Sequence, residues 1–143
     1  GGLARMRVYV DTSAFLAVLN ADDNNHEMAK NIWLQLLHTK VNLVCSSYIL
    51  VETFALVQNR LGMDAVRSFQ ELVVPLINIV WVDESVHNLG VNAILTANRK
   101  RLSLVDCTSF AVMRQAAIEK VFTFDKHFQE QGFKVMQPTS GTN

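Results

Sequence analysis

Four carboxylates are the residues of this sequence whose type and placement could carry chemistry: Asp11, Glu52, Asp106 and Asp125. Three of them lie at or near the ends of apolar runs typical of strands, and Glu52 lies early in an expected helix. Carboxylates that meet in one cleft repel each other unless a cation neutralises them, and Mg²⁺ or Mn²⁺ suits a site of carboxylate oxygens. Such ions bind a phosphodiester, lower the pKa of a bound water and stabilise the leaving oxygen. The acidic set therefore predicts metal-dependent cleavage of a phosphodiester.

Each aspartate also has a purely structural interpretation. Asp11 would cap the helix that follows it, and for Asp11 alone this explains the residue as well as a catalytic role does. Asp106 lies three residues after Ser103, which is the spacing of a capping box, and Asp125 would cap the short turn over residues 126–131. Taken singly, the capping role is favoured for both, so the predicted site depends on the four acids together.

Glu52 lacks an obvious structural explanation. If Ser46 or Ser47 caps its helix, the position that completes a capping box is Ile49 or Leu50 rather than Glu52. The residues three and four positions away include no basic partner: Tyr48, Ile49, Ala55 and Leu56. An acid without a partner on an apolar helix face is costly to bury, which favours a functional role.

The elements that must position these acids alternate along the chain. Short apolar runs predict strands at Met6–Val10, Leu43–Cys45, Leu76–Val82, Val121–Phe124 and Lys134–Met136. Helical spacing and start signals predict helices over Ser13–Leu19, from near Asn24 through Leu37, from Ser46 or Ser47 to Gly62, and over Met63–Val73, Glu84–Lys100 and Asp106–Ala117. Strands separated by helices imply an α/β fold with an open parallel sheet covered by helices on both faces. Ligands bind beyond the carboxyl ends of such strands, so the acids should meet at one edge.

Composition is that of a single globular domain. The 143 residues are 50% hydrophobic and 18% charged, which argues against a disordered chain or a coiled coil. No apolar run approaches the roughly 20 residues of a membrane span and no signal peptide is recognisable, so we expect a cytoplasmic protein without membrane contact. We expect the domain to span residues 6–136, with residues 1–5 a remnant of cloning and residues 137–143 a flexible tail.

Charge and cysteine content narrow the function further. The formal net charge is zero, so any contact with nucleic acid must be local rather than a diffuse grip on the backbone. Cys45 and Cys107 form no CxxC pair, and we expect free buried thiols in a reducing compartment.

A few other residues have a functional and a structural interpretation. The basic cluster Arg99–Arg101 would place cations at a helix C-terminus, which is slightly favoured, or contact a phosphate beside the site. A surface position is favoured for His127 over contact with substrate. Trp33 and Trp81 are interpreted as packing residues rather than base-stacking platforms. Leu95 is expected to face the core from its helix.

Four segments around the acids resemble the motifs of the PIN-domain nuclease family, in the family's order and spacing: Val8–Leu16, Ser47–Glu52, Leu102–Cys107 and Val121–Phe128. The resemblance runs over nearly the whole chain, residues 6–136. It implies a three-layer α/β/α sandwich with a parallel five-stranded sheet, and Mg²⁺- or Mn²⁺-dependent cleavage of RNA. It also implies that the four acids are catalytic and metal-binding residues, and it places Thr12, Ser13 and Thr123 where the family often supports its site.

Within that family the short chain is similar to the VapC-type toxins. This resemblance implies an endoribonuclease toxin that is held inactive by a cognate antitoxin and forms a homodimer. In this hypothesis Asp11 and Asp106 are the principal metal ligands, Asp125 supports them, and Glu52 holds a second metal or orients a water.

Three alternative functions stay open. One is a PIN-domain nuclease outside a toxin–antitoxin system. A phosphatase of the haloacid-dehalogenase type is disfavoured, because the second aspartate that its chemistry needs two residues after Asp11 is Ser13 here. A non-catalytic binding module on the same scaffold is disfavoured because all four acids are intact.

Overall fold

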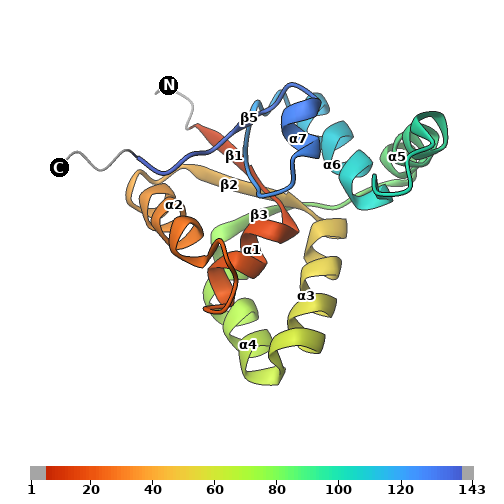
Figure 1. The fold of residues 1–143 in the computed structure, drawn as a ribbon. Coiled ribbons are helices and arrows are strands. Elements are labelled where there is room, and N and C mark those ends of the chain that lie inside the picture. Colours follow the sequence, from red (N-terminus) through yellow and green to blue (C-terminus); the bar gives the residue numbers. More distant parts are fainter. Residues whose placement is uncertain (1–5, 140–143) are drawn as a thin grey trace.

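The sheet predicted from the sequence is present and entirely parallel (Figure 1). A computed structural model describes residues 6–139, so the cloning remnant expected at residues 1–5 and the tail beyond residue 139 lie outside the described residues. The strands are β1 (Arg7–Val10), β2 (Asn42–Ser46), β3 (Ile77–Val80), β4 (Lys120–Phe122) and β5 (Lys134–Val135). They pair in the order β3-β2-β1-β4-β5, which puts the carboxyl ends of β1 and β4 side by side at the centre.

Helices cover both faces of this sheet. The α-helices are α1 (Thr12–Leu19), α2 (His26–His38), α3 (Ser47–Leu61), α4 (Met63–Ser68), α5 (Glu84–Ala97), α6 (Leu104–Gln115) and α7 (His127–Glu130). In Figure 1, α1, α2 and α4 lie on one side of the sheet and α6 and α7 on the other, with α5 packed against α6. The predicted three-layer α/β/α sandwich is confirmed.

Local sequence explains where the central elements begin and end. Residues Val8–Val10 of β1 are fully buried, and a strand buried on both faces carries the continuous apolar run seen in the sequence. Ser46 caps α3, because its Oγ accepts a hydrogen bond of 3.1 Å from the amide of Ile49. The same helix ends at Gly62, whose φ of 91° is unfavourable for a residue with a Cβ.

The helix predicted over Met63–Val73 is interrupted. α4 ends at Ser68, Phe69–Val73 continues as a π-helical turn, and Val74–Leu76 forms a 3-10 turn. Pro75 stands in that last turn and cannot continue the helix, because it has no amide proton to donate. The chain then turns directly into β3.

α5 is shorter and less buried than predicted. It ends at Ala97, because Asn98 takes the left-handed conformation (φ 50°) that closes the helix. Leu95, which was expected to face the core, is 71% exposed. α5 instead approaches α6 at Gly90, where a Cβ would lie only 2.5 Å from Thr108 Oγ1. A helix that meets its neighbour through a glycine buries a narrow face, which leaves Leu95 outside it.

Packing predictions for the tryptophans and cysteines have different outcomes. Trp33 is buried in the core, and both Cys45 and Cys107 are free and buried, as predicted. The prediction for Trp81 is wrong: its side chain is 71% exposed. Trp81 lies just beyond β3, in the connection that leads to α5, and therefore outside the strand in which it was predicted. Within residues 6–139, every helix is too short or too polar to span a bilayer.

Candidate active site

Asp11 is held by hydroxyl groups at the carboxyl end of β1. Its backbone amide donates to the carbonyl of Phe122 in β4 (3.1 Å), which continues the pairing of the two strands. Its Oδ2 accepts hydrogen bonds from Ser13 Oγ (2.8 Å) and Thr123 Oγ1 (2.9 Å). Asp11 occupies the N-cap position of α1, but its side chain makes no capping hydrogen bond. The capping interpretation is therefore wrong for Asp11.

The same two hydroxyls tie Asp11 to the loop that follows β4. Ser13 Oγ accepts from the amide of Phe124 (2.9 Å), and Thr123 Oγ1 accepts from the amide of Asp125 (2.9 Å). Each hydroxyl therefore donates to the Asp11 carboxylate and accepts from the backbone of the loop. This arrangement fixes the distance between the Asp11 and Asp125 segments, which lie more than a hundred residues apart in the sequence.

Thr12 has a different role from its neighbour. Thr53 Oγ1 of α3 donates to Thr12 Oγ1 over 3.4 Å, and both side chains are buried. The contact joins α1 to the helix that carries Glu52, so it positions elements rather than a carboxylate.

Asp106 combines the two roles that the sequence left open. It completes a capping box: its amide donates to Ser103 Oγ (3.0 Å), and its Oδ2 accepts from the amide of Ser103 (3.1 Å). α6 begins at Leu104, two residues before the predicted start, so Asp106 is the third residue of the helix. The capping prediction is confirmed for Asp106, and the same residue lines the acidic cleft with the other three acids.

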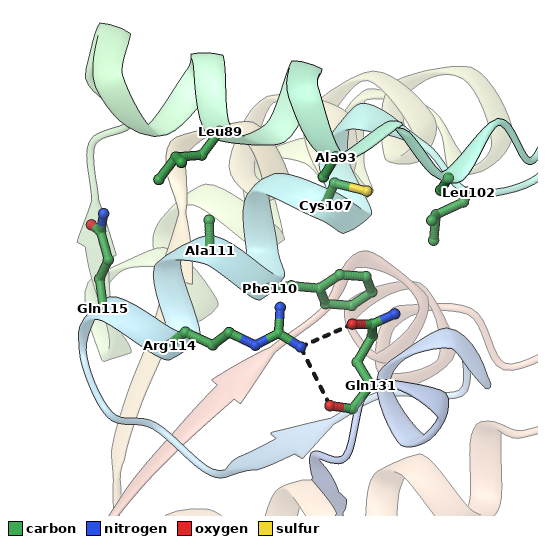
Figure 2. Close-up of a pocket in the computed structure, with 10 residues that line it drawn as sticks. Leu89, Ala93, Leu102, Cys107, Phe110, Ala111, Arg114, Gln115 and Gln131 are labelled. Atoms are coloured by element: carbon green, nitrogen blue, oxygen red, sulfur yellow. Dashed lines mark hydrogen bonds between the residues drawn. The ribbon is translucent and has the colours of Figure 1, made fainter. Parts of the chain in front are cut away.

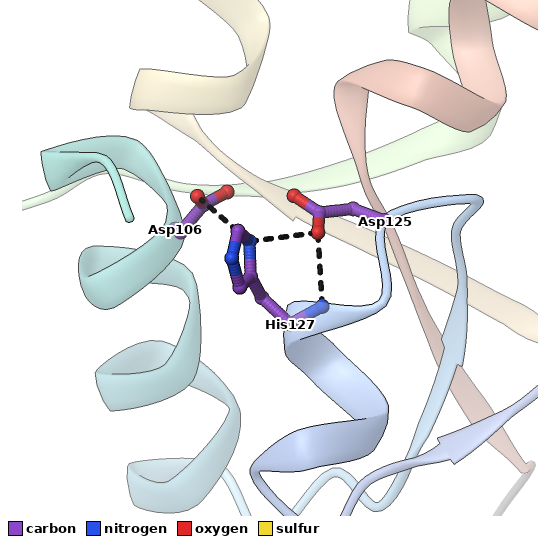
Figure 3. A group of neighbouring side chains, drawn as sticks. All are labelled: Asp106, Asp125 and His127. Carbon is purple, nitrogen blue, oxygen red and sulfur yellow. Dashed lines mark hydrogen bonds and ion pairs between the residues drawn. The ribbon is translucent and has the colours of Figure 1, made fainter. Parts of the chain in front are cut away.

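Asp125 caps the turn that follows it, as predicted, and its carboxylate also lies against the His127 ring (Figure 3). Its Oδ1 accepts from the backbone amide of His127 (2.9 Å), and His127 Nδ1 lies 2.8 Å from the same oxygen. α7 starts after Lys126 without a side-chain cap. The surface position favoured for His127 is wrong, since only 8% of this residue is exposed.

All four predicted acids line one cleft of about 310 Å³ at the carboxyl ends of β1 and β4. Glu52 is half-buried in α3 and, within the described part of the chain, makes no ion pair. The remaining lining residues are Thr12, Ser13, Leu16, Leu56, Arg60, Arg101 and Ser103. The topology therefore brings together residues from β1, α3, α6 and the loop after β4.

Burial and mutual repulsion disfavour the charged forms of Asp11 and Asp106. Burial raises the pKa of Asp11 to about 6, and the charges of Asp106 and Asp125 raise it as well. The hydrogen bonds from Ser13 and Thr123 act in the opposite direction. Burial also raises the pKa of Asp106, against a backbone hydrogen bond that lowers it, and the charge of Asp125 raises it again. A bound cation would relieve this repulsion.

Each aspartate is fixed through one oxygen and leaves the other without a hydrogen bond. In residues 6–139 these oxygens are Asp11 Oδ1, Asp106 Oδ1 and Asp125 Oδ2. Carboxylates that are oriented by hydrogen bonds on one side are suited to bind a metal on the other. The oxygen donors fit Mg²⁺ or Mn²⁺, and potential ligand atoms of Asp106, Asp125 and His127 lie within 4.8 Å of one another.

Two arginines, Arg60 and Arg101, line the cleft and add positive charge to it. Arg101 lines it, whereas Arg99 forms an ion pair of 3.2 Å with Glu130 on the surface. The last turn of α5 carries no basic residue, so the interpretation of the basic cluster as a helix-terminal charge is not supported. Arg60 was missed by the sequence analysis. It follows Glu52 by eight residues in one helix, and this spacing places both on the same face.

A second hollow of about 360 Å³ lies between α5 and α6 (Figure 2). Its lining is mainly apolar, including Leu89, Leu102 and Phe110. Arg114 crosses one side of it and donates to Gln131 Oε1 (2.9 Å). This groove contains no carboxylate, so its residues do not provide the oxygen ligands found in the cleft.

The family model of the PIN domain matches residues 8–134, which is most of the chain. The chain belongs to the PIN-domain family.

Within the family, the chain is similar to a particular toxin. The 23S rRNA-specific endonuclease VapC20 of Mycobacterium tuberculosis, strains CDC 1551 and H37Rv, is 31% identical over 134 residues, which cover 92% of this chain and 98% of the relative. The crystal structure of Mycobacterium tuberculosis VapC20, a sarcin–ricin loop cleaving toxin, has a TM-score of 0.79 at 30% identity and covers 92% of this chain and 99% of that chain. The chain is thus a VapC-type PIN-domain homologue.

More distant structures share the fold. FitAcB from Neisseria gonorrhoeae has a TM-score of 0.64 at 17% identity and covers 92% of this chain and 97% of that chain. FitAB bound to an IR36 DNA fragment has a TM-score of 0.66 at 18% identity and covers 95% of this chain and 98% of that chain. At these identities the similarity supports the architecture alone.

Proposed function

We propose that this protein is a Mg²⁺- or Mn²⁺-dependent endoribonuclease and the toxin of a toxin–antitoxin pair. One observation carries the proposal: three aspartates from separate segments line one cleft, and each has one fixed and one free carboxylate oxygen. Their similarity in place and chemistry to the PIN-domain motifs supports RNA as the substrate. Asp11, Glu52, Asp106 and Asp125 are the proposed catalytic and metal-binding residues.

The free oxygens of Asp11, Asp106 and Asp125 would hold the divalent ion. When bound, such an ion lowers the pKa of a coordinated water and stabilises negative charge on the phosphate. Among residues 6–139 no ion pair involves Glu52, and it would either orient the attacking water or hold a second ion. Attack in line with the leaving oxygen would produce a 5′-phosphate and a 3′-hydroxyl.

Arg60 and Arg101 are suited to bind the phosphates that flank the scissile bond. They line the cleft from α3 and from the loop before α6, and neither forms an ion pair within residues 6–139. Arginine binds phosphate oxygens with directional hydrogen bonds. Two such residues supply a local positive charge, which a chain of zero net charge needs in order to bind RNA.

The proposed substrate is a single-stranded or loop region of RNA. Phosphates in such regions can enter a narrow cleft, whereas duplex RNA keeps its backbone wound around the helix. VapC20 is named for 23S rRNA and for the sarcin–ricin loop, so a synthetic RNA of that loop is the first substrate to test. A cognate antitoxin and a homodimer are the proposed partners.

The test is cleavage of this RNA by the purified protein with Mn²⁺, with Mg²⁺ and with EDTA. We expect cleavage with either metal and none with EDTA, and ends that carry 5′-phosphate. Asp11→Asn purified in parallel controls for a contaminating ribonuclease. Equal cleavage in EDTA, or by the variant, would refute the metal-dependent function.

The toxin role has a separate test. Expression in a bacterial host should slow growth, and Asp11→Asn should relieve the effect. If the active nuclease leaves growth unchanged, a PIN-domain nuclease outside a toxin–antitoxin system is the better interpretation.

The other two alternatives predict different measurements. A haloacid-dehalogenase-type phosphatase would form a phosphoenzyme on Asp11. Ser13 occupies the position of its required second aspartate and instead donates a hydrogen bond to Asp11. A non-catalytic module would bind neither Mn²⁺ nor Mg²⁺.

A further inference from the structure

His127 lies between two of the proposed metal-binding acids, Asp106 and Asp125, and does not itself line the cleft. Figure 3 shows its ring between Asp106 of α6 and Asp125 of the loop after β4. Its Nδ1 is 2.8 Å from Asp125 Oδ1 and 3.8 Å from Asp106 Oδ2. It is therefore the side chain that connects these two carboxylates.

His127 is placed to support the acids rather than to meet the substrate. Only 10% of its side chain is exposed, and it is absent from the residues that line the acidic cleft. Asp106 and Asp125 line that cleft themselves. The imidazole therefore contacts them from the protein interior, while their free oxygens, Oδ1 and Oδ2 respectively, stay available for a cation.

The Nδ1 atom of His127 makes no complete hydrogen bond with Asp106 or with Asp125. Nδ1 is buried and, despite its short distance to Asp125, makes no well-aligned hydrogen bond. Nδ1 lies 2.8 Å from the Asp125 oxygen and within ion-pair distance of the Asp106 oxygen, at 3.8 Å, so an N–H at this position attracts both carboxylates. Nδ1 must carry the proton for this contact, because both neighbouring atoms are carboxylate oxygens.

The ring is also held in place by its own backbone and by the core. The amide of His127 donates to the same Asp125 oxygen that the ring approaches (2.9 Å). The next residue, Phe128, is fully buried and packs edge-on against Phe110 of α6 at a centroid distance of 5.0 Å. α7 is thereby anchored to α6, and the position of the ring relative to Asp106 is set by packing.

We propose that His127 is a positioning residue, which sets the separation of Asp106 and Asp125 through its Nδ1–H so that the pair can bind a divalent cation. This inference rests on the proposed metal-dependent function. Groups that orient metal ligands from behind typically contribute about 10–100-fold to metal affinity. The effect should depend on the donor at the Nδ1 position and not on the rest of the ring.

The test compares three variants of the full chain by calorimetric titration with Mn²⁺. His127→Asn keeps an N–H donor near the position of Nδ1, His127→Gln moves the donor toward the position of Nε2, and His127→Leu removes it. We expect the Mn²⁺ affinity of the Leu and Gln variants to fall about 10–100-fold. The Asn variant should retain most of the affinity of the wild type.

Several outcomes separate this proposal from others. Equal affinity in all three variants, with only melting temperature altered, would show that the residue is merely structural and overturn the proposal. Coupling of ¹⁴N to bound Mn²⁺ in pulsed electron paramagnetic resonance, lost in His127→Leu, would show direct ligation and overturn it as well. If the wild type binds no Mn²⁺, the metal-dependent function itself fails, and the positioning proposal fails with it.

Discussion

Two hollows of this molecule, the acidic cleft and the groove between α5 and α6, are similar in size and opposite in chemistry. The acidic cleft of about 310 Å³ is lined by four carboxylates that come from four different segments. The groove of about 360 Å³ between α5 and α6 is lined mainly by aliphatic and aromatic side chains. The larger hollow therefore lacks the acidic groups, and the smaller one concentrates them where they repel each other.

The difference lies in what each region contributes to folding. Apolar side chains in the groove stabilise the contact between two helices, and removing them from water favours the folded state. Asp11 and Asp106 of the cleft do the opposite, because burial and neighbouring charge raise the pKa of both carboxyl groups. Hydroxyl and amide donors nevertheless hold these acids in place. A cluster that is fixed against its own repulsion indicates selection for function rather than for stability.

The largest expected effect separates the two hollows by activity. Asp11→Asn should lower the rate of RNA cleavage roughly 10³-fold or more, because loss of a metal ligand removes several kcal/mol of transition-state stabilisation. Leu89→Ser in the groove should cleave at the wild-type rate. The measurement is the single-turnover rate with Mn²⁺. A comparable loss of rate in both variants would show that the groove, like the acidic cleft, takes part in catalysis.

The second effect is on the pH dependence of stability. The pKa of Asp11 is about 6 in the folded protein, against 3.8 ordinarily. A raised pKa means that the folded state binds the proton more tightly, so this stabilisation is present below about pH 4 and lost as the pH rises through 6. The two-unit difference corresponds to about 3 kcal/mol at neutral pH.

Asp11→Asn has no such proton and isolates the effect. In metal-free buffer, its free energy of unfolding relative to the wild type should increase by about 2.4 kcal/mol between pH 4 and pH 7.5. Urea denaturation at several pH values measures this difference. A difference that does not change with pH would mean that Asp11 is not destabilised by its surroundings.

The third effect is stabilisation by metal, of about 2.7 kcal/mol at a Mn²⁺ concentration a hundredfold above Kd. Asp106→Asn should lose most of it, and should melt above the wild type in EDTA because one repelling charge is gone. Asn can still accept from the Ser103 amide, and the backbone amide of residue 106 still donates to Ser103 Oγ, so both sides of the capping box can persist.

Ser103→Ala is the matched control for this third effect. It removes the hydroxyl that accepts from the Asp106 amide and should cost about 1 kcal/mol of stability, with the Mn²⁺-induced shift retained. If millimolar Mn²⁺ leaves the melting temperature of the wild type unchanged, the proposed metal site is wrong. If Ser103→Ala also loses the Mn²⁺-induced rise in melting temperature, that rise depends on the helix cap rather than on the Asp106 carboxylate alone.

The sequence predicted the acidic cleft more completely than its supporting residues. The four acids could be found because the ends of parallel strands meet at one edge, a rule that depends only on the order of the elements. The same reasoning could not choose between capping and catalysis. Asp106 does cap its helix, whereas Asp11 binds Ser13 and Thr123 instead.

His127 and Arg60 show where sequence reasoning stopped. His127 follows a loop in the sequence, and only the packing of α7 on α6 places it behind two acids. The sequence does contain a signal for Arg60, because a residue eight positions after Glu52 lies on the same face of the helix. The exposure of Leu95 could not be foreseen, because it depends on the close approach of α5 and α6 at Gly90.

The smallest expected effect tests this close approach, next to the groove and away from the cleft. Gly90→Ala would place a Cβ 2.5 Å from Thr108 Oγ1 and 3.1 Å from Leu104 Cδ1. Overpacking of this kind costs about 1–3 kcal/mol, and the better helix propensity of alanine returns up to about 1 kcal/mol. The variant should therefore lose about 1 kcal/mol in urea denaturation, with its Mn²⁺ affinity unchanged. Thr108→Ala removes the opposing oxygen, so Gly90→Ala should stabilise the protein in that background. If Gly90→Ala is destabilising to the same extent with and without Thr108, the clash lies elsewhere and the two helices do not meet as described. If it weakens Mn²⁺ binding, the helix contact and the acidic cleft are coupled, and the separation of the two regions does not hold.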